Sequence, residues 1–282
     1  MNPQRFPALI ERRYSKLRHY PILPSFVRRS PYNSQVMLIL SLDTTSEMGG
    51  VAIFRDHECL AESPHGSGGN YSVALFAGLD SILQAANIGI KEIDLFAAAN
   101  GPGSFTGIRT GLAAVLGWSK ACGRAARGVS VLHALAEEAA PSSECAIPIL
   151  DARRKEFYTA LFSRIPPAGE TRLAAAPLFD SRLFSPAAEG FVLGPAELLA
   201  LIQTTAEGAA SLTCVVRDHE VATQELRKSL PQGIGWVSVR GHLLAAIARL
   251  ARAAQLKGSE PSSQELDAYY IRRTDAETNL RD

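Results

Sequence analysis

Asn-Gly-Pro-Gly-Ser-Phe-Thr-Gly at positions 100–107 lies between an apolar run, 95–99, and a helical pattern of small and aliphatic residues. This order predicts a strand, a tight turn and a helix N-terminus. Gly101 and Gly103 allow backbone angles that other residues avoid, and Pro102 stiffens the turn.

The residues that follow the turn set two alternatives for its role. Ser104 or Thr106 can cap the helix, and the free N–H groups of its first turn would then face the space above the strand end. Such a loop can cradle a phosphate. It is equally consistent with a plain strand-to-helix connection, and the residues alone do not separate these alternatives.

The elements around this turn predict the fold class. Strands are expected at 37–43, 49–55, 57–63 and 94–99, and helices at 71–87 and 106–122. The first strand is apolar almost throughout, as expected for a central strand covered on both faces. Three strands, a helix, a strand and a helix is the order of the actin, hexokinase and Hsp70 type of domain, an α/β fold built from two βββαβα lobes.

The second half of the chain predicts a reduced second copy of this lobe. Strands at 146–151 and 156–162 form a hairpin around the turn 151–155. Helical patterns follow at 195–205, 219–229 and 240–257. We therefore expect three parts: an extension over 1–36, a first lobe over 37–139 and a second lobe over 140–282, whose last helix can cross back to the first.

The extension differs from the rest of the chain in charge. It holds seven basic residues and one acidic residue, whereas the remainder holds 22 basic and 27 acidic residues, a net charge of −5. It can be a disordered basic tail, an organelle presequence or the product of a start codon placed too far upstream. We favour the last, with Met37 as the start. The acidic remainder argues against nucleic-acid binding by this chain alone.

Composition excludes several classes of function. No apolar run reaches the roughly 20 residues needed to span a bilayer. The four scattered cysteines form no CxxC motif and are typical of a reduced, cytoplasmic protein. The six histidines form no HxxxH or HxxH pair, so no metal site is expected. No nucleophile with a base and an oxyanion stabiliser is evident, so no catalytic residue is assigned.

Asp43-Thr44-Thr45-Ser46 follows the first strand, where nucleotide-binding domains of this type place a phosphate loop. A carboxylate there can hold hydrated Mg²⁺ while hydroxyls and N–H groups meet phosphate. The alternative is a hairpin tied by short side-chain hydrogen bonds. Because the second half has no convincing second phosphate loop, we expect at most a vestigial loop. Its residues would be Asp43, Thr44, Thr45, Ser46, Gly101 and Gly103.

A row of small residues marks the helix after the turn. Gly107, Gly111, Ala114, Gly117 and Ala121 recur at roughly helical spacing. Glycine costs about 1 kcal/mol relative to alanine in a helix interior, so close approach of another backbone is the expected compensation. The partner is either the helix 71–87 or a second chain.

Four segments are similar to the TsaB family, also called YeaZ, and occur in the family's order. They are 40–46 (LSLDTTS), 101–112 (GPGSFTGIRTGL), 151–158 (DARRKEFY) and 270–273 (YIRR). The resemblance covers essentially 37–282. It implies an actin-like fold and a non-catalytic partner of the paralogue TsaD, which with the ATPase TsaE forms threonylcarbamoyladenosine beside the anticodon of tRNAs that read ANN codons.

The resemblance also implies which functions are absent. Val131 and Leu135 stand where the paralogue has its metal-binding HxxxH pair, so the active-site metal is not expected here. No cofactor is expected for this chain alone, with ATP or ADP and Mg²⁺ acting in the complex. The rival interpretations are an active ATP-dependent transferase or kinase and, with less support, a glycoprotease-type peptidase.

The same resemblance implies a contact with TsaD through the helices of the first lobe, or a homodimer through that surface when TsaD is missing. tRNA would be reached only through the complex. The predicted interface residues are Tyr71, Ala74, Leu75, Gly107, Gly111, Ala114 and Trp118. A large side chain at Gly111 is expected to weaken the contact and leave the monomer folded.

Overall fold

A computed structural model describes residues 36–64, 71–139, 142–164, 184–186, 190–218, 221–257, 266–268 and 271. The side chains of 71–74, 184–186, 221 and 224 lie outside this description. Apart from Val36, so does the extension predicted for residues 1–36, and so does most of the segment 270–273.

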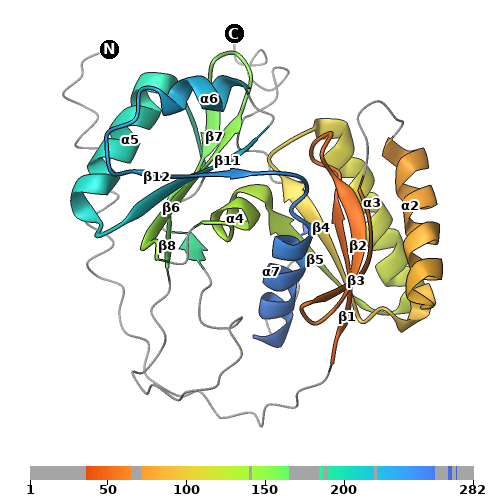
Figure 1. Cartoon of the computed structure of the whole chain (residues 1–282). Helices are drawn as coiled ribbons and strands as arrows, with labels where there is room; N and C mark the ends of the chain where they lie inside the picture. The colour runs from red at the N-terminus through yellow and green to blue at the C-terminus, as the bar shows by residue number, and fades with distance from the viewer. Residues whose placement is uncertain are drawn as a thin grey trace, which may run out of the picture. The chain divides into compact units, whose positions relative to one another are not determined.

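The first lobe is a five-stranded sheet with helices on both faces (Figure 1). Its elements are β1 (Leu38–Asp43), β2 (Gly50–Arg55), β3 (Glu58–Pro64), α2 (Tyr71–Ala86), β4 (Leu95–Gly101), α3 (Phe105–Cys122) and β5 (Ala125–Ser130). The strand order is β3-β2-β1-β4-β5. β1 pairs antiparallel with β2 and parallel with β4.

Burial on both faces explains why β1 and β4 are apolar along most of their length. Leu40 and Leu42 belong to the hydrophobic cluster under α2 and α3, whereas Ile39 belongs to the cluster on the opposite face, which includes helix α7 (Leu244–Leu256). Successive side chains of a strand point to opposite faces, so a strand covered twice has no polar face.

The second lobe is a sheet with the main order β10-β7-β6-β11-β12. After α4 (Val131–Ala136), its elements are β6 (Cys145–Asp151), β7 (Phe157–Thr159), β8 (Phe162–Arg164), β9 (Phe184–Pro186), β10 (Phe191–Leu193), α5 (Pro195–Gly208), β11 (Leu212–Arg217), α6 (Val221–Arg227) and β12 (Gly235–Val239). The strand predicted at 156–162 is divided into β7 and β8, which both pair with β6.

Both lobes follow the same order, which confirms the predicted actin-like class. In each, an antiparallel hairpin is followed by a helix, a parallel strand, a second helix and another parallel strand. The parallel pairs are β1/β4 and β4/β5 in the first lobe and β6/β11 and β11/β12 in the second. Right-handed crossover helices are the usual connection between such strands.

The last helix joins the two lobes. α7 follows the final strand of the second lobe and packs against β1, β4 and β5 of the first (Figure 1). Ser41 Oγ donates to Leu244 O at 2.8 Å, and Arg252 Nε lies 3.1 Å from Asp56 Oδ1. Among the described residues, no helix is long and apolar enough to cross a membrane.

Cys214 in β11 makes the stability of the second lobe dependent on pH. Burial raises the pKa of its thiol from 9.0 to about 12. Between these values the unfolded chain ionises this thiol and the folded chain does not, so the free energy of unfolding falls as pH rises above about 9. The slope from one such group is at most about 1.4 kcal/mol per pH unit. Urea unfolding at pH 8 and pH 10 should show a smaller fall for Cys214→Ala than for the native chain, and equal falls would contradict the assignment.

Candidate functional site: the cleft between the lobes

A cleft of about 640 Å³ separates the loops of the two lobes. The loop after β1, the turn before α3, the β6–β7 hairpin and the end of β11 line it, together with one residue each of α4 and α6. The described lining residues are Thr45, Ser46, Glu47, Pro102, Gly103, Ser104, Val131, Leu150, Asp151, Ala152, Arg153, Tyr158, Arg217 and Ala222. Thr45, Ser46 and Gly103, predicted from the sequence for a phosphate loop, therefore meet at one place.

The loop after β1 is held by short internal hydrogen bonds. Asp43 Oδ1 accepts from Thr45 N at 3.0 Å and from Thr45 Oγ1 at 2.6 Å. Asp43, Thr44 and Thr45 are all nearly fully buried. These are the bonds that the alternative interpretation, a tied hairpin, requires.

The Gly-Pro-Gly turn is fixed to this loop. Ser104 N donates to Thr45 O at 2.7 Å, and Ser104 Oγ caps α3 by accepting from Gly107 N. Gly101 has a φ of 117° where the register of β4 and β5 shifts, which is a conformation that glycine adopts readily. The predicted cap and the predicted glycine conformation are therefore present.

Two glycines of α3 lie against Thr44 rather than on an outer surface. A Cβ added at Gly107 would overlap the carbonyl oxygen of Thr44, and one at Gly111 would overlap Thr44 Oγ1. Thr44 Oγ1 also donates to Gly107 O at 2.6 Å. The small residues at the start of α3 therefore allow the β1 loop to lie directly on the helix backbone.

This geometry corrects the predicted interface. Gly107, Gly111 and Leu75 are buried inside the chain, so a partner cannot reach them. The expectation that a large side chain at Gly111 leaves the monomer folded is wrong for the same reason. Ala114 and Trp118 are half-buried, and the side chains of Tyr71 and Ala74 lie outside the described residues.

Arg217, which no sequence pattern singled out, reaches the β1 loop from the second lobe. It ends β11, and its side chain is 2% exposed. Its Nη2 lies 3.1 Å from Asp43 Oδ2, and its Nη1 donates to Ser46 Oγ at 2.5 Å. A cation at the end of an otherwise apolar strand, Leu212–Arg217, was the signal available in the sequence.

The residues around Asp43 do not fit a hydrated Mg²⁺ ion. Both carboxylate oxygens already accept hydrogen bonds, Oδ1 from Thr45 and Oδ2 from the Arg217 guanidinium. A divalent cation at this carboxylate would lie beside a buried positive charge, which is unfavourable in a poorly solvated position. Asp43 therefore connects the two lobes, and no reaction step is assigned to a metal here.

The β6–β7 turn places positive charge at the opposite side of the cleft. Arg153, Arg154 and Lys155 all have positive φ, between 55° and 63°. Asp151 Oδ1 accepts from Arg153 N at 2.7 Å, and Arg153 lines the cleft. Three consecutive side-chain-bearing residues in this conformation store backbone strain, which folded proteins retain where the surrounding structure imposes it.

The outer face of α2 and α3 carries exposed aromatic side chains. Phe76 is 52% exposed and meets Trp118 edge-to-face at 6.1 Å between ring centres. Phe105 is 45% exposed, with the Arg109 guanidinium 3.7 Å from its ring centre. Leu75, Leu79 and Ile82 form the buried face of α2. Phe76 follows Leu75 in the helix and therefore lies at the edge of this face.

The positions that the resemblance compares with the paralogue's histidines lie in the core. Val131 and Leu135, on α4, are 1% and 0% exposed and pack in the cluster that includes α7. In the part of the chain that the structure describes, no group of three His, Cys, Asp or Glu side chains could hold a metal ion.

Residues 63–182, less than half of the chain, match the family model described as "TsaD: tRNA N6-adenosine threonylcarbamoyltransferase". The chain is 34% identical over 128 residues to the tRNA threonylcarbamoyladenosine biosynthesis protein TsaB of Bacillus subtilis strain 168, which covers 45% of this chain and 55% of that protein. TsaB of Haemophilus influenzae is 30% identical over 131 residues, covering 44% and 53%. The chain thus matches about half the length of these curated relatives.

A solved structure extends the likeness in fold to both lobes. YeaZ from Pseudomonas aeruginosa superposes with a TM-score of 0.61 at 21% identity, covering 83% of this chain and 99% of that one. This match shows the shared fold.

Proposed function

We propose that this chain is a member of the TsaB/YeaZ family and takes part in forming threonylcarbamoyladenosine in tRNA, as the non-catalytic partner of a TsaD-type subunit. The names of its relatives and the TsaD-type match support the pathway. The relatives are matched over about half their length, so their names support the pathway but not the role of this chain within it.

The observation that carries the non-catalytic role is the buried ion pair of Asp43 and Arg217. It occupies the carboxylate that nucleotide-binding proteins of this fold class use for a metal and its phosphates. With both of its oxygens engaged, the Asp43 carboxylate is not open to Mg²⁺. We therefore assign the chemistry to the partner, together with ATP and Mg²⁺, and expect no bound nucleotide in the isolated chain.

The partner surface is the outer face of α2 and α3. Phe76 is exposed there, and the half-buried Trp118 packs edge-to-face against it. Aromatic side chains of this kind are enriched at protein–protein interfaces. This face would bind the TsaD-type subunit, or a second copy of the chain when that subunit is absent. TsaE and tRNA would join through the resulting complex.

The test reconstitutes the reaction with TsaD, TsaE and the adenylate-forming enzyme from the same genome. We expect threonylcarbamoyladenosine in tRNA to form only when this chain is included. Phe76→Glu should weaken capture of TsaD at least about tenfold, because it places a charge in the centre of the apolar face. The matched control is Gln84→Glu, which adds the same charge at an exposed position of the same helix.

Two results would contradict the proposal. One is equal capture of TsaD by Phe76→Glu and Gln84→Glu, which would place the interface elsewhere. The other is hydrolysis of ATP or modification of tRNA by the isolated chain, which would favour the transferase or kinase interpretation.

A further inference from the structure

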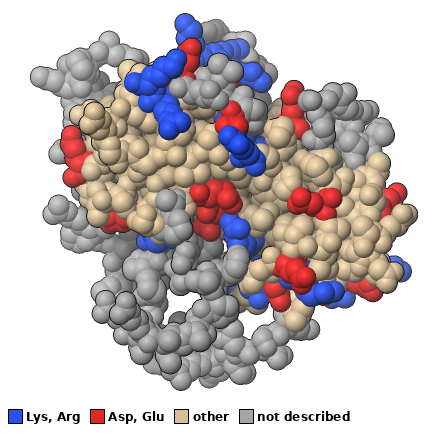
Figure 2. Space-filling view, viewed as in Figure 1, with Lys and Arg blue, Asp and Glu red and all other residues tan. Residues whose placement is uncertain are grey.

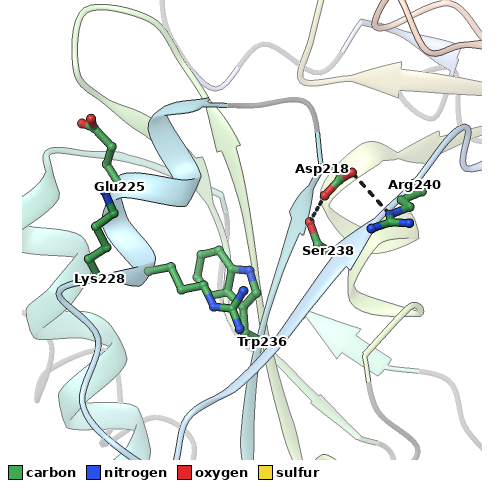
Figure 3. Close-up of a pocket in the computed structure, with 7 residues that line it drawn as sticks. Asp218, Glu225, Lys228, Trp236, Ser238 and Arg240 are labelled. Atoms are coloured by element: carbon green, nitrogen blue, oxygen red, sulfur yellow. Dashed lines mark hydrogen bonds and ion pairs between the residues drawn. The ribbon is translucent and has the colours of Figure 1, made fainter.

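A second hollow, on the second lobe, is not explained by the cleft or by the partner surface. Its volume is about 770 Å³, and it lies between α6 and the strands β11 and β12 (Figure 3). The described lining residues are Asp218, Glu225, Arg227, Lys228, Trp236, Ser238 and Arg240. None of these lines the cleft between the lobes.

An aromatic ring and a guanidinium form the centre of this hollow. Trp236, on β12, is half-buried, and the Arg227 guanidinium carbon lies 5.8 Å from the centre of its ring. This separation exceeds the contact distance of about 3.7 Å seen for the other such pair, Arg109 over Phe105. Arg227 ends α6 and is exposed, so its long side chain can move the remaining distance needed to admit a flat ring between the two groups.

A cluster of three polar side chains, Asp218, Ser238 and Arg240, flanks the Trp236 ring. Asp218 Oδ1 accepts from Ser238 Oγ at 2.9 Å, and Arg240 Nε lies 3.4 Å from Asp218 Oδ2. The Arg240 side chain is 87% exposed, which leaves its terminal N–H groups accessible to a ligand. In Figure 3, Trp236 lies between this group and Lys228.

The hollow is locally basic, whereas residues 37–282 as a whole are acidic. Arg227, Lys228 and Arg240 outnumber Asp218 and Glu225, and Glu225 points away from Trp236 in Figure 3. Figure 2 shows Lys and Arg side chains gathered along the upper edge of the molecule in that view. The hollow thus combines a stacking face with local positive charge on a chain whose residues 37–282 are acidic.

We propose that this hollow binds an unpaired nucleotide, with its base stacked on Trp236 beneath Arg227 and its phosphate held by Lys228 and Arg240. Asp218 accepts a hydrogen bond from a sugar hydroxyl or a base amino group. Stacking on aromatic and guanidinium planes with basic groups at the backbone is the general means of binding single-stranded RNA. The volume lies within the usual range for small-ligand sites, about 300–1,000 Å³.

RNA is the expected source of the nucleotide, and this choice rests on the proposed role in tRNA modification. A free nucleotide carries the same base, sugar and phosphate groups as a nucleotide in RNA. RNA and free nucleotides must therefore both be tested. An acidic peptide is less favoured, because carboxylates use the three cations but leave the face of Trp236 without a partner. One such contact supplements the hold of a larger complex on RNA, since the acidic chain offers no extended basic face.

The fluorescence of Trp236 provides a local test. The chain has two tryptophans, so Trp118→Phe leaves Trp236 as the only reporter. In this background the full-length protein is titrated at low salt with AMP, single-stranded poly(U), duplex RNA and poly-glutamate. Binding elsewhere, including on the basic extension, leaves this signal unchanged.

We expect saturable quenching by poly(U) and weaker quenching by duplex RNA. The apparent Kd for poly(U) should rise about 5- to 100-fold in Lys228→Ala and in Arg240→Ala. The matched control Lys91→Ala removes an exposed lysine of the first lobe and should leave the Kd unchanged. Tighter binding of AMP than of poly(U) would also support the site and would assign it to free nucleotides.

No quenching by poly(U) or AMP, or equal affinity in Lys228→Ala, Arg240→Ala and Lys91→Ala, would overturn the proposal. Stronger quenching by poly-glutamate would overturn it in favour of an acidic peptide. These measurements use the isolated chain, so their failure is distinct from failure of the reconstituted tRNA reaction, which tests the proposed function.

Discussion

Arg217→Ala should lower the free energy of unfolding by about 3–5 kcal/mol, because it leaves the Asp43 carboxylate buried without its cation. The Arg217 side chain is 2% exposed and that of Asp43 is fully buried, so the carboxylate would lose its cation in a poorly solvated position. Urea unfolding followed by circular dichroism measures the change. The matched control is Arg124→Ala, which removes an arginine paired at 3.2 Å with Asp94 where both side chains are exposed. Surface pairs contribute at most about 1 kcal/mol.

The double variant Asp43→Ala with Arg217→Ala separates the pair from the packing of each side chain. Removing both charges should cost less than the sum of the single variants, because neither charge is then left unpaired. Equal losses for Arg217→Ala and Arg124→Ala would show that the pair is solvated and that the Asp43 carboxylate remains open to a metal ion.

Gly107→Leu is expected to unfold the chain or to destabilise it by at least about 3 kcal/mol. The first atom of any side chain at this position overlaps the carbonyl oxygen of Thr44, and backbone cannot rotate away as a side chain can. Thr44 adjoins Asp43, so a displaced loop also disturbs the ion pair with Arg217. The loss should appear as a lower melting temperature or as insoluble protein.

Gly117→Leu is the control on the same helix. Gly117 is exposed, and an added Cβ would meet nothing within 4 Å. Leucine has a better helix propensity than glycine, so this variant should gain up to about 1 kcal/mol. If both variants fold with native stability, α3 does not lie against the β1 loop as described, and the small residues would again be available to a partner.

The fold was predictable because periodicity and turn residues agree along the first lobe. The strands around Gly49-Gly50 and Asp56-His57, the helices α2 and α3, and the Ser104 cap all lie close to their expected positions. The strands β5, β10, β11 and β12 were not predicted. Each has only three to six residues, which offer too little alternation to separate a strand from a loop or a short helix.

The site was less predictable because it depends on contacts between distant segments. Asp43 and Arg217 are 174 residues apart, so no local spacing reveals that they form a pair. The small residues of α3 were recognised as a close-packing surface, but the sequence offered only a neighbouring helix or a second chain as partner. In the structure, the partner is the loop at Thr44. A loop backbone leaves no periodic pattern in the sequence, so this partner could not be identified from the sequence.

The position of α7 has a consequence for synthesis of the chain on the ribosome. Ser41 bonds to Leu244 O across 203 positions, and α7 covers one face of a sheet whose strands are complete by residue 130. Until α7 leaves the ribosome exit tunnel, the apolar face that includes Ile39 and Leu95 lacks the cover that this helix supplies. The first lobe therefore cannot finish folding until α7 has been translated, and the two lobes complete their folding together.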